Sequence, residues 1–166
     1  GSVGCCETVI GIVKGHAAAE VIRSGAKAIS GLGIQGSNLD KLGACGACEF
    51  LAVSLEKYIA HDAVITAVCE AISNLCFVHE TNFSGVNRDT FGSCGTCENL
   101  VVVFEHHNAE NSVFHIVSAI AGLAHLHTSN STKLGALGAI KHLVSSYEKH
   151  RSSERLVAAV CRGLAS

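Results

Sequence analysis

Apolar residues recur at helical spacing in four segments of the chain. In one of them, Cys48 is followed by apolar residues three, four and seven positions later, which places all four on one face of a helix. The four apolar sets are Cys6, Val9, Ile10 and Val13; Cys48, Leu51, Ala52 and Leu55; Cys97, Leu100, Val101 and Phe104; and Ile140, Leu143, Val144 and Tyr147. This pattern predicts four amphipathic helices, each with one buried face.

A second type of segment follows each amphipathic one and is apolar around most of its circumference. These segments are residues 21–32, 63–76, 112–125 and 154–164. The first three end alike, as Ala-Ile-Ser-Gly-Leu, Ala-Ile-Ser-Asn-Leu and Ala-Ile-Ala-Gly-Leu. Because a helix that is apolar on most sides must be covered on most sides, we expect these segments to pack between neighbouring helices.

A short motif precedes three of the amphipathic segments. It begins at Asn38, Asn87 and Asn130, and in each copy an apolar residue, a Gly and a second Gly follow four, five and eight positions later. Asparagine suits a helix N-cap, since its side chain accepts hydrogen bonds from the free amides of a first turn. Glycine suits a chain reversal, where a Cβ would be unfavourable. The motif therefore predicts a short helix from each Asn to the Gly pair.

The three helices form a repeating unit. The Asn motif recurs after 49 and then 43 residues, and a partial copy, Gly4-Cys5-Cys6-Glu7, lies 42 residues before Gly46. Three helices in about 42 residues are typical of an α-solenoid. We predict an all-α fold in a single domain of residues 1–166, a right-handed α-solenoid of about four repeats that forms part of a longer array. The predicted repeats are 3–41, which lacks its first helix, 42–90, 91–133 and 134–166.

Two short sequences carry a resemblance to a known family. The Gly-Ala-Cys-Glu at residues 46–49 and the Ala-Ile-Ser-Asn-Leu at residues 71–75 resemble the armadillo (ARM) repeat family, and the similarity extends over nearly the whole chain. The resemblance implies a concave groove, lined by the third helices, that binds an extended peptide. In this family an Asn near the end of the third helix holds the peptide backbone, and a Trp one turn earlier forms side-chain pockets.

The chain departs from the family at those groove positions. Only Asn74 matches the family's Asn; the equivalent positions hold Gly31, Gly122 and Gly163, and the Trp positions hold Lys27, Glu70, Ser118 and Ala159. We predict a protein–protein interaction scaffold with a partner-binding strip along the third helices. The residues predicted for this strip are Lys27, Gly31, Glu70, Asn74, His115, Ser118 and Gly122.

A second candidate contact lies outside this strip. Phe83 is the apolar residue of an otherwise polar insertion near residues 78–86, and insertions in solenoids emerge as loops that often bind partners. The charges of Lys27 and Glu70 and the net charge of −2 favour a protein or peptide partner over nucleic acid. No apolar run is long enough to span a bilayer.

The cysteines suggest other functions. Cys45-x-x-Cys48 and Cys94-x-x-Cys97 have the spacing of metal or redox sites, and a metal- or redox-responsive helical domain is an alternative interpretation. Core packing is preferred, because Ile140 occupies the position equivalent to Cys48 and Cys97.

The ends of the repeat array and the odd cysteine count support further expectations. A self-assembling repeat module is another alternative, since the predicted terminal helices have no polar caps and a fragment of this kind could self-associate through its truncated ends. No residue pattern is typical of an enzyme, and no cofactor is expected. Nine cysteines, an odd number, favour a reducing compartment, either cytoplasmic or nuclear.

Overall fold

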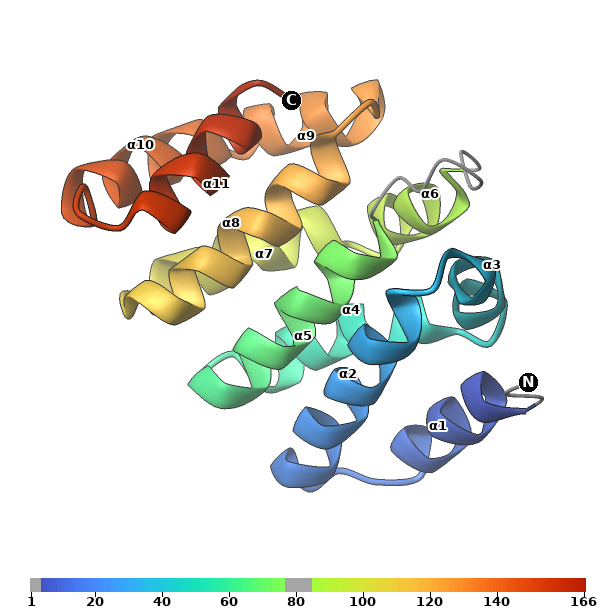
Figure 1. Ribbon diagram of the computed structural model, residues 1–166. Helices are drawn as coiled ribbons and strands as arrows, with labels where there is room; N and C mark the ends of the chain where they lie inside the picture. Colours follow the sequence, from blue (N-terminus) through green and yellow to red (C-terminus); the bar gives the residue numbers. More distant parts are fainter. Residues whose placement is uncertain (1–3, 77–84) are drawn as a thin grey trace.

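The computed structural model describes residues 4–76 and 85–166, and within these residues the chain forms eleven α-helices and no strand (Figure 1). The helices are α1 (Cys5–Lys14), α2 (Ala19–Gly33), α3 (Gly36–Ala44), α4 (Ala47–Lys57), α5 (Asp62–Leu75), α6 (Val86–Ser93), α7 (Thr96–His106), α8 (Glu110–Ala124), α9 (Thr128–Ala136), α10 (Ala139–Lys149) and α11 (Glu154–Leu164). They group into a two-helix unit, α1–α2, and three three-helix units, α3–α5, α6–α8 and α9–α11. The fold is an all-α solenoid, as the repeated helical pattern predicted.

The third helices α2, α5, α8 and α11 lie side by side along the solenoid (Figure 1). They match the four strongly apolar segments of the sequence to within two residues at each end. Contact between successive third helices is the most extensive packing between units, so α5 and α8 are each covered on both sides. This explains why these two helices are apolar around most of their surface.

The helices place the unit boundaries earlier than the predicted repeats. The boundaries predicted before residues 42, 91 and 134 fall inside α3, α6 and α9, which begin at Gly36, Val86 and Thr128. The predicted repeats begin at the apolar residue four positions after each motif asparagine, whereas each first helix begins one or two positions before that asparagine.

The motif asparagines are not helix caps, which corrects the sequence prediction. The residues that precede α3, α6 and α9 are Gln35, Gly85 and His127. Asn87 and Asn130 are instead buried within the first turn of their helices. The Asn87 Nδ2 donates to the Leu39 carbonyl (3.1 Å) and the Leu75 carbonyl (3.3 Å), and Asn130 makes the equivalent pair of bonds to the carbonyls of Arg88 (2.9 Å) and Leu123 (3.3 Å).

Each asparagine therefore joins three segments. It connects its own first helix to the first helix of the preceding unit and to the C-terminal end of the preceding third helix. The Leu75 and Leu123 carbonyls lie in the last turns of α5 and α8, where they have no donor within their own helix, and the asparagine amide supplies one.

The two glycines of the motif have different roles. An added Cβ at Gly43 would overlap the Asn87 Oδ1, and one at Gly92 would overlap the Asn130 Oδ1, so the first glycine makes room for the asparagine of the next unit. The second glycine is the predicted chain reversal: Gly46 and Gly95 precede the second helices with φ of 86° and 80°. That left-handed conformation is readily adopted only by glycine.

The buried cysteines serve as core residues. Cys48 and Cys97 are completely buried, and Cys45 and Cys94 are half-buried. Burial raises the pKa of Cys97 to about 11 and that of Cys48 still higher, so both thiols remain protonated at neutral pH. The described residues contain no group of three or more His, Cys, Asp or Glu side chains that could hold a metal ion.

One predicted core face is exposed. Leu143 is buried as expected, but Ile140, Val144 and Tyr147 are 57%, 43% and 44% exposed. The positions are apolar as in the other units, yet no described helix packs against this side of α10. None of the described helices is both long enough and apolar enough to cross a membrane.

Candidate functional site

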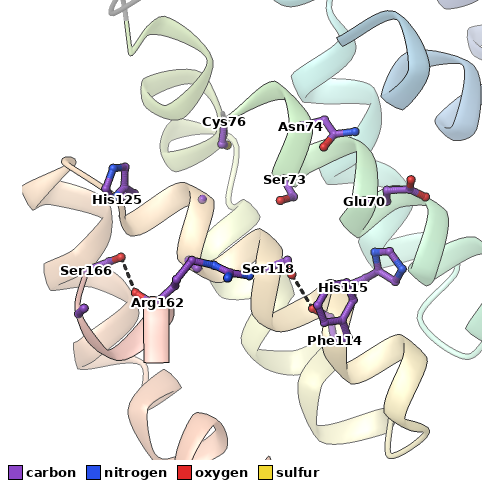
Figure 2. Close-up of a pocket in the computed structure, with 13 residues that line it drawn as sticks. Glu70, Ser73, Asn74, Cys76, Phe114, His115, Ser118, His125, Arg162 and Ser166 are labelled. Atoms are coloured by element: carbon purple, nitrogen blue, oxygen red, sulfur yellow. Dashed lines mark hydrogen bonds between the residues drawn. The ribbon is translucent and has the colours of Figure 1, made fainter. Parts of the chain in front are cut away.

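A pocket of about 860 Å³ opens between three successive third helices, α5, α8 and α11 (Figure 2). The residues that line it are Glu70, Ser73, Asn74 and Cys76 on or just after α5; Phe114, His115, Ser118, Ala121, Gly122 and His125 on or just after α8; and Arg162, Ala165 and Ser166 at the end of α11. Because α8 lies between the other two helices, its side chains form the floor and those of α5 and α11 form the walls.

The structure brings five of the predicted strip residues together in this pocket: Glu70, Asn74, His115, Ser118 and Gly122. Lys27 and Gly31 are exposed on α2, one helix further along, and do not line the pocket. Phe83 lies outside the described residues, so the alternative contact at the insertion stays a prediction.

Asn74 is engaged within the protein. Its Nδ2 donates to the Ser30 Oγ at 2.9 Å and approaches the Ser30 carbonyl at 3.4 Å, which links α5 to α2. The side-chain oxygen of Asn74 accepts no hydrogen bond from the described residues. A peptide amide that donates to this oxygen therefore fits the site without disturbing the contact between α5 and α2.

Gly122 allows close packing between helices. An added Cβ would lie 3.1 Å from the Cys76 Cβ and 3.6 Å from the Ser73 carbonyl oxygen, closer than most side chains tolerate. The glycine therefore brings α8 close to α5 at the floor of the pocket. At the equivalent position of α2, Gly31 faces open space, since an added Cβ there would meet nothing within 4 Å.

The floor combines an aromatic ring with a histidine. Phe114 and His115 make an edge-to-face contact with ring centroids 5.1 Å apart, and the Arg155 guanidinium of α11 lies 4.5 Å from the Phe114 centroid. Burial lowers the pKa of His115; the nearby Glu70 partly opposes this shift and Arg155 adds to it. His115 is therefore neutral at physiological pH and can both donate and accept a hydrogen bond.

The two walls carry opposite charges. Glu70 is half-buried on α5, and Arg162 is exposed on α11 with Phe114 and Ser118 between them (Figure 2). Sequence reasoning missed Phe114 and Arg162, because neither occupies the Asn or Trp position of the family. Phe114 gives one signal, as an aromatic residue on a third helix of a chain with only 5% aromatic residues.

A Ser, His and Asp do meet elsewhere, in an arrangement that does not activate the serine. The Ser112 Oγ donates to the Asp62 Oδ1 rather than to His107. The His107 Nδ1 lies 3.0 Å from the same Asp62 oxygen, and its Nε2 lies 2.7 Å from the Ile59 carbonyl oxygen. No ring nitrogen is in position to remove the serine proton, so the cluster ties α7 and α8 to the preceding unit.

Known structures share this architecture. A designed armadillo repeat protein superposes with a TM-score of 0.81 at 21% identity, and a designed armadillo repeat protein in complex with the peptide (KR)4 superposes with 0.78 at 21% identity. Each comparison covers 98% of this chain and 64% of the other. An engineered protein superposes with 0.81 at 15% identity, over 96% of this chain and 61% of its own.

The chain thus spans less than two thirds of the length of these structures. No protein-family model and no curated protein matches the sequence. The structural similarity shows that the chain has an armadillo-like repeat fold, as the resemblance implied.

Proposed function

We propose that this chain is an interaction scaffold that binds an extended peptide segment of a protein partner across α5, α8 and α11. The observation that carries the proposal is the pocket itself, which is built by three successive third helices and combines an aromatic floor with charged walls. The designed structure that contains the peptide (KR)4 supports this use of the fold. The Ser112–Asp62–His107 geometry leaves the serine without a base, so the proposal includes no catalysis at this cluster.

The lining of the pocket indicates a peptide of mixed charge. Glu70 suits a basic side chain, and Arg162 on the opposite wall suits an acidic one, since an arginine can bind a carboxylate through two hydrogen bonds. Phe114 and Ala121 offer an apolar surface between them. A purely basic peptide would fit this site poorly, because Arg155, Arg162 and Lys27 on the third helices would repel its positive charges.

The experiment selects binding peptides from a random displayed library on the intact chain and measures their affinity for groove variants by fluorescence anisotropy. We expect Glu70→Lys and Arg162→Glu each to weaken binding about 5- to 50-fold, since each replaces an attraction with a repulsion in a partly desolvated site. Glu56→Lys on the exposed surface of α4 is the matched charge reversal and should leave affinity unchanged.

One outcome would directly contradict the proposed location of the binding site. If both groove variants bind with unchanged affinity while a Phe83→Ala variant does not bind, the inserted segment is the site and the groove proposal fails. Unfolding in urea should show similar midpoints for all variants, because neither Glu70 nor Arg162 is fully buried.

A reducing compartment, cytoplasmic or nuclear, is part of the proposal. All nine cysteines are free thiols, and Cys48, Cys69, Cys76 and Cys97 are buried with raised pKa values. Such thiols behave as small apolar side chains and form stable structure without disulfides.

A further inference from the structure

The solenoid exposes an apolar surface at its C-terminal end, separate from the groove. This C-terminal face consists of Leu137, Ile140, Val144, Tyr147 and Leu164. Three of these residues lie on one side of α10, four and then three positions apart. This exposed apolar side of α10, with Leu137 directly after α9 and Leu164 at the end of α11, is a candidate interaction site.

The same positions are covered in the inner units. Ile140 corresponds to Cys48 and Cys97, which are completely buried, and Tyr147 corresponds to Phe104, which is 5% exposed. The cover is the first and second helices of the next unit, because α4 packs on α6 and α7, and α7 packs on α9 and α10. The Phe104 and His142 rings, on α7 and α10, have centroids 5.4 Å apart. The Cys48 Sγ, for example, lies 3.9 Å from the Asn87 carbonyl oxygen.

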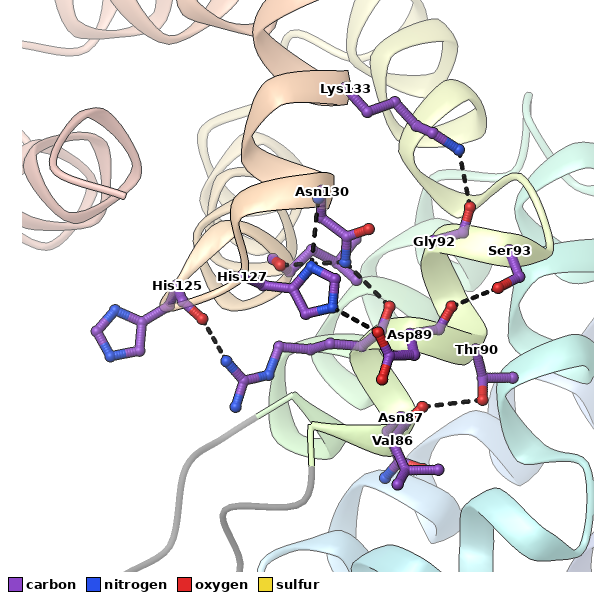
Figure 3. A network of polar contacts seen from close by, with 12 residues as sticks. Val86, Asn87, Asp89, Thr90, Gly92, Ser93, His125, His127, Asn130 and Lys133 are labelled. Carbon is purple, nitrogen blue, oxygen red and sulfur yellow. Dashed lines mark hydrogen bonds and ion pairs between the residues drawn. The ribbon is translucent and has the colours of Figure 1, made fainter.

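The glycine of the motif shows what kind of helix fits. Gly43 accommodates Asn87, and Gly92 accommodates Asn130 from the next unit, as the network around Asn130 shows (Figure 3). Gly135 is the third member of the series, and an added Cβ there would meet nothing within 4 Å. The space over Gly135 is therefore open at the position that the asparagine of the next unit fills over Gly43 and Gly92.

The charges near this space add a second requirement. Between the third and fourth units, the Lys133 Nζ donates to the Gly92 carbonyl at 2.9 Å and pairs with Glu98 at 3.3 Å. The residue that corresponds to Glu98 in the last unit is Lys141, so the sign of the charge is reversed. A helix that covers this face needs an acidic residue where α9 has Lys133.

A second copy of this chain lacks these features at its opposite end. The described N-terminal edge is α1, whose sequence CCETVIGIVK contains no asparagine. Head-to-tail stacking of two copies would therefore leave the space over Gly135 unfilled.

We propose that the C-terminal face docks one complete three-helix armadillo unit, whose first helix inserts an asparagine over Gly135 and places an acidic residue against Lys141. The unit covers Ile140, Val144 and Tyr147 as the first and second helices of the next unit cover their equivalents. This inference is independent of the groove and of the proposed peptide.

The experiment supplies such a unit from the chain's own sequence. Residues 125–166 are appended after Ala165, which corresponds to Ala124, and the appended copy alone carries Lys133→Glu. We expect the backbone amides of α10 to exchange with deuterium at least 10-fold more slowly in the extended chain than in the 166-residue chain, because docking buries that helix. Unchanged exchange in α10 would overturn the proposal, whether the appended unit is folded or not.

A substitution at Gly135 tests the asparagine directly. In the 166-residue chain, Gly135→Ala should raise the melting midpoint by about 2 °C, since alanine is the better helix former and the space is open. In the extended chain the same substitution should lower the midpoint, and Asn130→Ala in the appended copy should restore the increase. The same sign in both chains would overturn the proposal.

Sedimentation velocity on the 166-residue chain tests whether a second copy of the chain covers the C-terminal face instead. We expect a monomer. A concentration-dependent dimer that Ile140→Glu abolishes would identify a second copy as the partner of the C-terminal face and overturn the proposal.

Discussion

At the scale of single residues, the contact between asparagine and glycine is the feature most specific to this solenoid. The Asn130 amide bonds two buried carbonyls from the preceding unit, and this is possible because Gly92 has no side chain. We expect Gly92→Ala to lower the free energy of unfolding by about 1–3 kcal/mol, since the new methyl group displaces the amide and leaves the Leu123 carbonyl at the end of α8 unpaired. Urea denaturation measures the loss. Gly135→Ala in the same chain is the matched control and should be neutral or stabilising.

The sequence predicted that these asparagines matter but not how. Asn87 and Asn130 share local features with helix caps, because both are followed by a short helix. Their partners, Leu39 and Arg88, lie in the preceding unit, and a local pattern carries no information about contacts more than 40 residues away. A double-mutant cycle between Gly92→Ala and Asn130→Ala should show coupling above about 0.5 kcal/mol, and strict additivity would contradict the contact.

At the scale of elements, the connections between second and third helices also join units. The Tyr58 hydroxyl donates to the Ala17 carbonyl at 2.5 Å, and His107 occupies the corresponding position in the next unit, next to the Ile59 carbonyl. Asp62, the first residue of α5, accepts a hydrogen bond from the Ser112 hydroxyl and contacts His107. The beginning of α8 is thereby tied to the beginning of α5.

This connection predicts a dependence on pH. The hydrogen bond from Ser112, and then the hydrogen bond and charge of His107, lower the pKa of Asp62 from its ordinary value of 3.8. A lowered folded-state pKa stabilises the protein above the ordinary value, and this stabilisation is lost as pH falls through the folded-state value. At pH 7, Asp62→Asn should cost at most about 1 kcal/mol, because Asp62 is largely exposed and screened by solvent.

Urea unfolding between pH 2 and pH 7 measures the effect. The difference between Asp62→Asn and the unsubstituted chain should shrink as pH falls from 7 towards 2, because the stabilisation by the ionised carboxylate is lost as Asp62 takes up its proton. Glu56→Gln, an exposed carboxylate on α4, is the control and should show no comparable dependence. A constant difference across the whole range would mean that the charge of Asp62 contributes nothing.

The elements themselves were largely predictable from the sequence. The third helices follow from apolar residues that recur at helical spacing, and the reversals at Gly46 and Gly95 follow from the need for a positive φ. The starts of the first helices were not predicted, because Gly36, Val86 and Thr128 differ from one another and share no capping pattern.

At the scale of the whole molecule, the sequence predicted where the groove lies better than what lines it. Glu70, Asn74 and Ser118 line the pocket because a regular stack of third helices places equivalent positions in one line. Arg162 was missed because it occupies neither of the family's two groove positions, so the repeat register gave no reason to place it in the pocket. Nor does an apolar pattern show whether a neighbouring unit is there to cover it, which is why Ile140 was assigned to the core.

That end effect gives the final prediction, a comparison of one substitution at two equivalent positions. Val101 on α7, a helix covered by the next unit, is 7% exposed, and Val144 on α10 is 43% exposed on the C-terminal face. Val101→Ala removes two buried methyl groups and should cost about 2 kcal/mol, with the exact loss set by how far the site collapses. Val144→Ala should cost less than about 0.5 kcal/mol, because its side chain is already in contact with water.

Urea denaturation of both variants at several protein concentrations makes the comparison. The two substitutions remove the same atoms at equivalent helical positions. The difference between the two sites is therefore the presence or absence of a covering unit. Equal losses would show that the C-terminal face is buried in solution, and if the loss at Val144 grew with protein concentration, the cover would be a second copy of the chain. Unequal losses that do not depend on concentration would show an inner interface at Val101 and an open one at Val144, as expected for a solenoid in which each unit is stabilised by its immediate neighbours.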